Sequence, residues 1–125
     1  MPTTLAELMA AAEARIRRLE PAEAWAAAVA GEATIVDVRS TEDRAAGVVP
    51  GSVHVPRTVL EWRLAPHSEW RNPDLVGSPI LLMCAHGFSS VLAAATLVDL
   101  GVDAADIRGG FEAWAAAGLP HSAPK

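Results

Sequence analysis

The sequence predicts an α/β domain whose central, mainly parallel sheet is covered by helices on both faces. Two observations carry this prediction. Short apolar runs typical of buried strands, "ATIVDV" at 33–38 and "PILLM" at 79–83, alternate with stretches whose apolar residues recur at helical spacing. Glycine and proline separate these segments, as expected of turns. Such alternation favours parallel strands joined by crossover helices.

Composition limits the classes of protein that the chain can represent. With 125 residues, 51% of them hydrophobic and 20% charged, it fits one globular domain. A net charge of −5 without basic clusters beyond "RIRR" predicts neither a nucleic-acid partner nor a membrane partner. The amino-terminal stretch lacks the order of a secretory signal, and no apolar run reaches the length of a membrane span. We therefore expect a cytoplasmic protein.

The chain opens with two predicted helices. Apolar residues at helical spacing predict an amphipathic helix over residues 5–19, within a helical extension at 1–19 that precedes a core at 20–121. A second helix is expected to begin at Pro21 and to end at Gly31.

The buried strand at 33–38 begins the predicted sheet, since β-branched residues dominate it. A polar segment, "TEDRAAG", then fits one or two helical turns closed by Gly47. The remaining features before residue 79 are a turn at Pro50-Gly51, a short strand at 53–55, a helix over 58–64, and an irregular surface segment interrupted by Pro66 and Pro73.

The second half repeats the alternation of strand and helix. A strand at 80–83 leads through a glycine-bearing loop into a helix that begins at Ser89 or Ser90 and ends before Gly101. Either serine could cap this helix. A short strand near Ile107, a turn at Gly109-Gly110 and a last helix over 111–118 complete the series.

Cys84, the only cysteine, lies between the carboxyl end of the strand at 80–83 and the amino end of the following helix. Unpaired N–H groups and the positive end of the helix dipole favour an anion there. A thiolate in such a place can have its pKa lowered to about 3.5–7.5. We favour a reactive thiol over the alternative of a small buried core residue. One cysteine excludes an internal disulfide, and no Cys/His spacing indicates a metal site.

Four motifs resemble single-domain rhodanese-like sulfurtransferases, in the order and spacing of that family. They are "IVDVRSTED" with Gly47, "VPGSVHVP", "CAHGFSS" and "RGGFEAWAAAGLP", which together cover about residues 20–121. The resemblance implies a rhodanese-like α/β domain without a cofactor. It also implies that Cys84 takes a sulfane sulfur from a small-molecule donor such as thiosulfate and holds it as a persulfide. The acceptor would be cyanide or a thiol, either a small thiol or a thioredoxin-like protein.

The same resemblance assigns an active-site loop that runs from the cysteine through Ala85, His86, Gly87, Phe88 and Ser89. Its backbone N–H groups would surround the persulfide. The family often has arginine where this chain has Ser89, and histidine where it has Val48. His86 could bind an anionic donor or simply face solvent. Ser89 and Ser90 could bind the persulfide or substrate, although helix capping accounts for at least one of the two serines.

Cations for an anionic donor would have to come from outside the loop. Arg57 and Arg63, which follow the strand at 53–55, are candidates because guanidinium groups bind oxyanions in a fork geometry. Asp37 and Arg39 flank the end of the first strand, and their family counterparts are mainly structural. An ion pair of Arg39 with Glu42 or another nearby carboxylate is the simpler account.

The sequence leaves two other functions as alternatives. A cysteine phosphatase also has a loop between strand and helix, but its chemistry needs an arginine six positions after the cysteine, where this chain has Ser90. A non-catalytic module is the second alternative, in which the domain recruits a partner or Cys84 senses oxidants.

Overall fold

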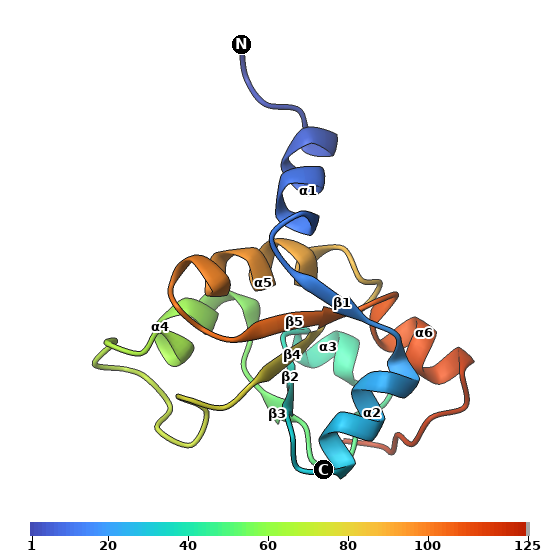
Figure 1. Cartoon of the computed structure of the whole chain (residues 1–125). Coiled ribbons are helices and arrows are strands. Elements are labelled where there is room, and N and C mark those ends of the chain that lie inside the picture. The colour runs from blue at the N-terminus through green and yellow to red at the C-terminus, as the bar shows by residue number, and fades with distance from the viewer. Residues whose placement is uncertain (125) are drawn as a thin grey trace.

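The computed structural model describes residues 1–124 and has a five-stranded sheet at its centre (Figure 1). The strand order is β1-β5-β4-β2-β3, and every pairing is parallel. The strands are β1 (Arg17–Leu19), β2 (Thr34–Asp37), β3 (Val53–His54), β4 (Ile80–Met83) and β5 (Ala104–Ile107). The predicted parallel sheet is therefore confirmed.

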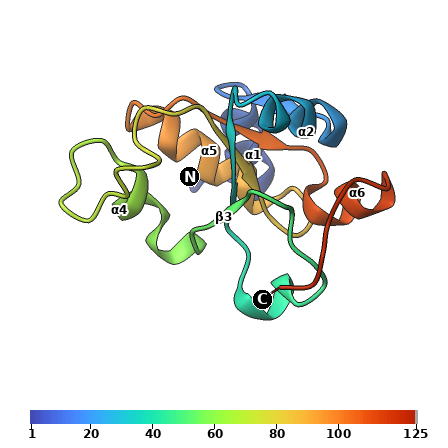
Figure 2. The same cartoon turned by 90° about the horizontal axis from the view of Figure 1, so that it is seen from below.

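The described residues also form six α-helices and one 3-10 helix. They are α1 (Leu5–Glu13), α2 (Pro21–Val29), α3 (Thr41–Arg44), η1 (Arg57–Val59), α4 (Leu60–Leu64), α5 (Ser89–Asp99) and α6 (Gly110–Ala116). Figure 2 shows α4 and α5 on one side of the sheet and α2 and α6 on the other. This arrangement confirms the expectation of helices on both faces.

The central strand β4 is buried along its whole length, which explains its continuous apolar run. Because successive side chains of a strand point to opposite faces, Ile80 and Leu82 join one core cluster, whereas Leu81 and Met83 join the other. The first cluster lies under α4 and α5, and the second lies under α2 and α6. In the second cluster the rings of Trp25 and Trp114 meet edge to face at 5.8 Å.

The prediction of one helix over residues 5–19 is wrong in its second half. Helix α1 ends at Glu13, and Arg17–Leu19 forms β1, which pairs with β5 at the edge of the sheet. The apolar spacing fits a helix, but strand pairing across the chain overrides it because Leu19 packs into the second core cluster. Figure 1 shows α1 rising from the body beside α5. There Ala12 contacts the buried Val91 and Ala95.

The remaining predicted elements are confirmed with small shifts at their ends. The helix expected at 58–64 is divided into η1 and α4, and the strand expected at 53–55 is limited to Val53–His54. None of the helices in residues 1–124 is both long enough and apolar enough to cross a membrane.

Candidate active site

The loop that carries Cys84 leaves the carboxyl end of β4 and enters α5 at Ser89. Its position between strand and helix is as predicted. Gly87 has a φ of +82°, and a Cβ at this position would collide with the backbone of Gly109. Glycine is therefore needed both for the turn of the loop and for its close contact with the turn before α6.

The first turn of helix α6 is hydrogen-bonded to the backbone of the loop. The backbone N–H of Phe111 donates to the Cys84 carbonyl at 2.8 Å, and the N–H of Glu112 donates to the Ala85 carbonyl at 3.1 Å. Since the C=O and N–H of one peptide point in opposite directions, these bonds turn the N–H groups of Ala85 and His86 away from α6. Gly110 permits this contact, because a Cβ there would meet the Cys84 carbonyl oxygen.

Three hydrogen-bonding groups surround the Cys84 sulfur, which is almost completely buried. The N–H of Gly87 donates to Sγ at 3.1 Å, the N–H of Ser90 donates at 3.4 Å, and the Ser90 hydroxyl lies 3.2 Å away. Burial raises the pKa of the thiol, but hydrogen bonds from Ser90, Ser89 and Gly87 lower it. The net result is a pKa below the ordinary value for cysteine, which favours the nucleophilic thiolate.

Ser90 does not cap α5, contrary to the prediction that one of the two serines would. The N-cap is Phe88, and no side chain bonds to the first turn there. The Ser90 side chain is instead fully buried, where its hydroxyl donates to Asp106 Oδ2 at 2.9 Å. It prefers this partner because the carboxylate of Asp106, on β5, is itself fully buried and needs hydrogen-bond donors.

Arg18 of β1 completes this buried chain of side chains. Its Nε donates to Asp106 Oδ1 at 2.8 Å, and its Nη2 donates to Oδ2 at 3.0 Å. The same Nη2 donates to the Gly87 carbonyl at 3.1 Å. A bidentate arginine–carboxylate pair is geometrically specific and strong. Arg18 thus touches both the loop and the carboxylate that binds Ser90.

Asp37 and Arg39 form a second buried ion pair at the end of β2, with 2.8 Å between Arg39 Nη2 and Asp37 Oδ2. Asp37 is thus the carboxylate partner of Arg39, and not Glu42. Arg44 also donates to Asp37. The Arg39 guanidinium lies 4.2 Å from the centre of the Phe111 ring, a cation–π arrangement. This pair links the end of β2 to α6.

The two proposed donor-binding arginines have partners elsewhere in the chain. Arg57 donates to both carboxylate oxygens of Glu61, at 2.8 and 2.9 Å. Arg63 donates to the carbonyl of Trp70 at 2.6 Å. These hydrogen bonds connect neither arginine to the loop, so their role in binding a donor stays a prediction.

The rim of the loop is exposed and carries an imidazole, a phenyl ring and a carboxylate. His86 Nδ1 lies 2.7 Å from Glu112 Oε2, and Phe88 is 69% exposed. A hollow of about 360 Å³ borders the loop between Ala85, His86 and Phe111. A donor or acceptor approaching the sulfur would meet this rim.

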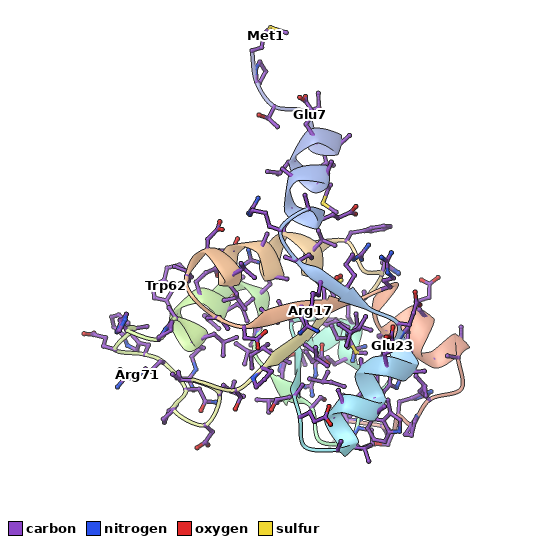
Figure 3. The ribbon with its side chains drawn as sticks, in the orientation of Figure 1. Met1, Glu7, Arg17, Glu23, Trp62 and Arg71 are labelled. Carbon is purple, nitrogen blue, oxygen red and sulfur yellow. The ribbon has the colours of Figure 1, made fainter. Side chains whose placement is uncertain are left out.

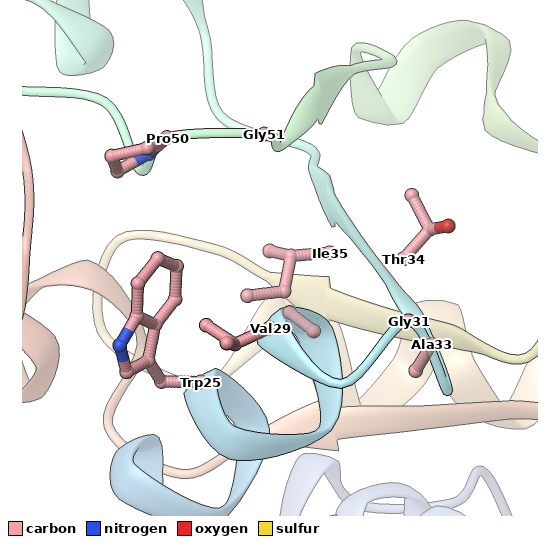
Figure 4. A pocket seen from close by; sticks show the side chains of 9 residues that line it. Trp25, Val29, Gly31, Ala33, Thr34, Ile35, Pro50 and Gly51 are labelled. Carbon is pink, nitrogen blue, oxygen red and sulfur yellow. The ribbon is translucent and has the colours of Figure 1, made fainter.

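A larger hollow, of about 490 Å³, lies away from Cys84 (Figure 4). Its lining includes Trp25, Val29, Thr34 and Pro50 but no residue of the loop. It borders the start of β2, whereas the loop follows the end of the parallel strand β4. Ligands of open parallel sheets bind at the carboxyl ends of the strands, so position and chemistry favour the smaller hollow. Within residues 1–124, no group of three potential metal ligands occurs.

Comparison with known proteins agrees with this geometry. The family model of the rhodanese-like domain matches residues 20–117. The chain belongs to the rhodanese-like domain family. A structure of a rhodanese-related protein from Thermoplasma volcanium is 25% identical, with a TM-score of 0.70, and the match covers 85% of this chain and 97% of that chain.

Two further solved structures are similar to this chain. A protein of unknown function from Rhodopseudomonas palustris, described as a possible tyrosine phosphatase, is 34% identical with a TM-score of 0.87, and the match covers 98% of this chain and 99% of that chain. A thiosulfate sulfurtransferase from Pseudomonas aeruginosa is 23% identical with a TM-score of 0.67. There the match covers 86% of this chain but 19% of that chain, and the likeness shows the fold.

Sequence reasoning missed Arg18 and Asp106 as parts of this rhodanese-like site. Arg18 stands in "RIRR", which has the appearance of ordinary surface charge, and the family model begins after it. Asp106 carried a signal: it is a carboxylate in the middle of an otherwise apolar strand, where all four residues are buried. Because a buried carboxylate requires a partner, this position in the sequence indicates that a cation lies nearby.

Proposed function

We propose that this rhodanese-like domain is a sulfurtransferase that carries a sulfane sulfur as a persulfide on Cys84. The observation that carries the proposal is the convergence of the Gly87 and Ser90 N–H groups on one buried sulfur whose pKa is lowered. Membership of the rhodanese-like family supports it. The same donors that favour the thiolate would favour the negatively charged persulfide.

The chemistry needs two displacement steps and no external oxidant. In the first, the Cys84 thiolate attacks the outer sulfur of the donor, a new S–S bond forms, and the donor's S–S bond breaks. With thiosulfate, the electron pair leaves with sulfite. In the second, cyanide or an acceptor thiolate attacks the outer sulfur of the persulfide, and the electron pair of the broken bond returns to Sγ. Because Cys84 must be a free thiol, the activity suits a reducing compartment such as the cytoplasm.

The rim of the loop bears on the choice of donor. Arg57 and Arg63 are paired with Glu61 and the Trp70 carbonyl, and the imidazole of His86 lies against Glu112. A doubly charged donor such as thiosulfate would therefore depend mainly on the loop amides. We expect a persulfide of a small thiol to load Cys84 at least as readily as thiosulfate. The acceptor we propose is a small thiol or a thioredoxin-like protein.

Phosphate-ester hydrolysis, suggested by the description of the Rhodopseudomonas palustris protein, finds less support. The sixth position after Cys84 holds Ser90, whose buried side chain bonds to the Asp106 carboxylate. A phosphatase needs a cation at that position to hold the phosphate oxygens. The carboxylate behind Ser90 has the opposite charge.

The test is the intact mass of the protein before and after incubation with thiosulfate or with a small-thiol persulfide, followed by cyanide. We expect a gain of one sulfur atom that cyanide removes as thiocyanate and that a Cys84→Ser variant never shows. Phosphate release from an aryl phosphate serves as a parallel assay. No sulfur gain from either donor would overturn the proposal, and stable oxidation of Cys84 by peroxide would then favour a redox sensor.

A further inference from the structure

Arg18 lies at the meeting point of two hydrogen-bonded paths that both end on the Cys84 sulfur. One path runs through Asp106 and the Ser90 hydroxyl, with links of 3.0, 2.9 and 3.2 Å. The other runs through Gly87, whose carbonyl accepts from Arg18 and whose N–H donates to the sulfur. Arg18 and Asp106 come from β1 and β5, and neither belongs to the loop.

The Ser90 hydroxyl has a single proton to donate and two neighbours that can accept it. When Cys84 is a thiol, the hydroxyl donates to Asp106 and accepts the S–H of the cysteine. When Cys84 is a thiolate or persulfide, the sulfur needs that proton, and Asp106 must give up its bond from Ser90. Asp106 can do so because Arg18 still donates to both carboxylate oxygens.

The charges around Cys84 also indicate that Arg18 favours a negatively charged sulfur. Asp106 is completely buried, so its negative charge close to Cys84 would oppose a second negative charge on the sulfur. Arg18 is mostly buried and neutralises that charge. The hydrogen bonds that Arg18 donates to Asp106 raise the pKa of Arg18 and desolvation lowers it, while the charges of Asp106, Glu13 and Cys84 add to the rise. The positive charge of Arg18 thus favours a negative charge on the Cys84 sulfur.

We propose that Arg18 and Asp106 are positioning residues that let the Ser90 hydroxyl turn toward Cys84 when the sulfur becomes negatively charged. The consequence for sulfur transfer rests on the proposed function, whereas the behaviour of the thiol does not. Removal of Arg18 leaves the Asp106 charge opposed to the thiolate. Removal of the Asp106 charge leaves the positive charge of Arg18 unneutralised, and this charge stabilises the thiolate. The two single variants should therefore shift the ionisation of Cys84 in opposite directions.

The test is the rate of Cys84 alkylation by iodoacetamide as a function of pH, read from intact mass, since the chain has one cysteine. For Arg18→Met we expect a rate at neutral pH about tenfold below that of the wild type, corresponding to about one pKa unit, with recovery at high pH. For Asp106→Asn we expect a rate at neutral pH above that of the wild type. Arg18→Lys, which keeps the charge, should restore most of the rate.

Arg17→Met is the matched control. Arg17 is the neighbour of Arg18 on β1, but its side chain is exposed and lies 3.9 Å from the equally exposed Asp103 (Figure 3). It should leave the alkylation profile unchanged. The other charged groups around the site are Glu13 beside Arg18, the His86–Glu112 pair at the rim, and Arg39 paired with Asp37. All variants retain His86, so any effect of its imidazole on alkylation is common to all of them.

Each outcome decides the proposal. Opposite shifts in the two single variants, with the double variant Arg18→Met/Asp106→Asn near the wild type, support it. Shifts in the same direction, or none beyond the Arg17→Met control, overturn it. If thermal unfolding shows that Arg18→Met does not fold, Asp106→Asn is compared with the double variant instead. Alkylation at neutral pH should be faster in Asp106→Asn and should return toward the wild-type rate in the double variant, and equal rates in the two overturn the proposal. Opposite shifts without sulfur uptake from any donor would overturn the proposed function alone, whereas uptake without these shifts would overturn only this inference.

Discussion

At the scale of single residues, Cys84 depends on donors rather than on a dedicated base. The Gly87 and Ser90 amides and the Ser90 hydroxyl offset the cost of burying a charged sulfur. A histidine base, as found in other cysteine nucleophiles, is not needed when the thiolate is favoured in this way. His86, the only histidine in the loop, interacts with Glu112 instead.

The lowered pKa of Cys84 predicts how stability depends on pH. In the unfolded chain the thiol has a pKa of about 8.5. Between the folded pKa and that value the unfolded chain binds more protons, so the free energy of unfolding rises with pH. The contribution is complete above the unfolded pKa and is lost as pH falls through the folded pKa. Urea unfolding at a series of pH values should show wild type gaining stability over Cys84→Ser toward alkaline pH, and then levelling off. A difference that does not vary with pH would contradict the lowered pKa.

At the scale of elements, the contact between the loop and the turn before α6 holds the site together. Two backbone bonds connect Phe111 and Glu112 to the loop carbonyls, and both Gly109 and Gly110 have positive φ. The turn thus orients the loop amides without touching the sulfur itself.

A pair of glycine substitutions tests this contact. Gly110 and Gly118 both have positive φ, but only at Gly110 would a Cβ collide, with the Cys84 carbonyl. Gly118→Ala should cost about 1–2 kcal/mol of backbone strain alone. Gly110→Ala should lower the free energy of unfolding further and also slow Cys84 alkylation, because the loop must move. Equal losses of stability and equal thiol reactivity in the two variants would show that the contact does not orient the loop.

The sequence indicates the elements of the sheet better than it indicates their partners. Strands β2 and β4 are evident from continuous apolar runs, since buried parallel strands need little else. Strand β1 cannot be predicted from the sequence, because three residues are too few to show a period and pairing with β5 decides their conformation. The sequence likewise favours Ser89 or Ser90 as the helix cap. Whether Ser90 bonds to the helix end or to a buried carboxylate depends on Asp106, sixteen positions away.

At the scale of the whole molecule, the amino-terminal segment has two parts with different importance. Helix α1 covers a small cluster on α5, and much of its surface is exposed, including Leu5 and Leu8. Strand β1 belongs to the sheet and brings Arg18 to the site. The family model begins at residue 20, after both parts.

Two truncations separate these parts. Deletion of residues 1–12 keeps Glu13 beside Arg18 and should leave the pH profile of Cys84 alkylation unchanged, with a modest loss of stability from exposing Val91 and Ala95. Deletion of residues 1–19 removes Arg18 and leaves Asp106 buried without its cation, which should cost about 3–5 kcal/mol. It should also slow alkylation at neutral pH. Thermal unfolding and the rate of alkylation are measured for both truncated forms. Equal stability and equal alkylation rates in the two forms would show that the site does not need β1.

The pairing of β1 with β5 also has a consequence for the order of events in folding. Residues 17–19 meet residues 105–107, which lie 88 positions further along the chain. Contacts so distant in sequence carry a high entropic cost of closure, and edge strands can dock after the centre of a sheet has formed. A folding chain with β4 and α5 in place but β1 undocked would have the loop without Arg18. The reactivity of its one thiol would then mark the moment at which the two ends of the chain come together.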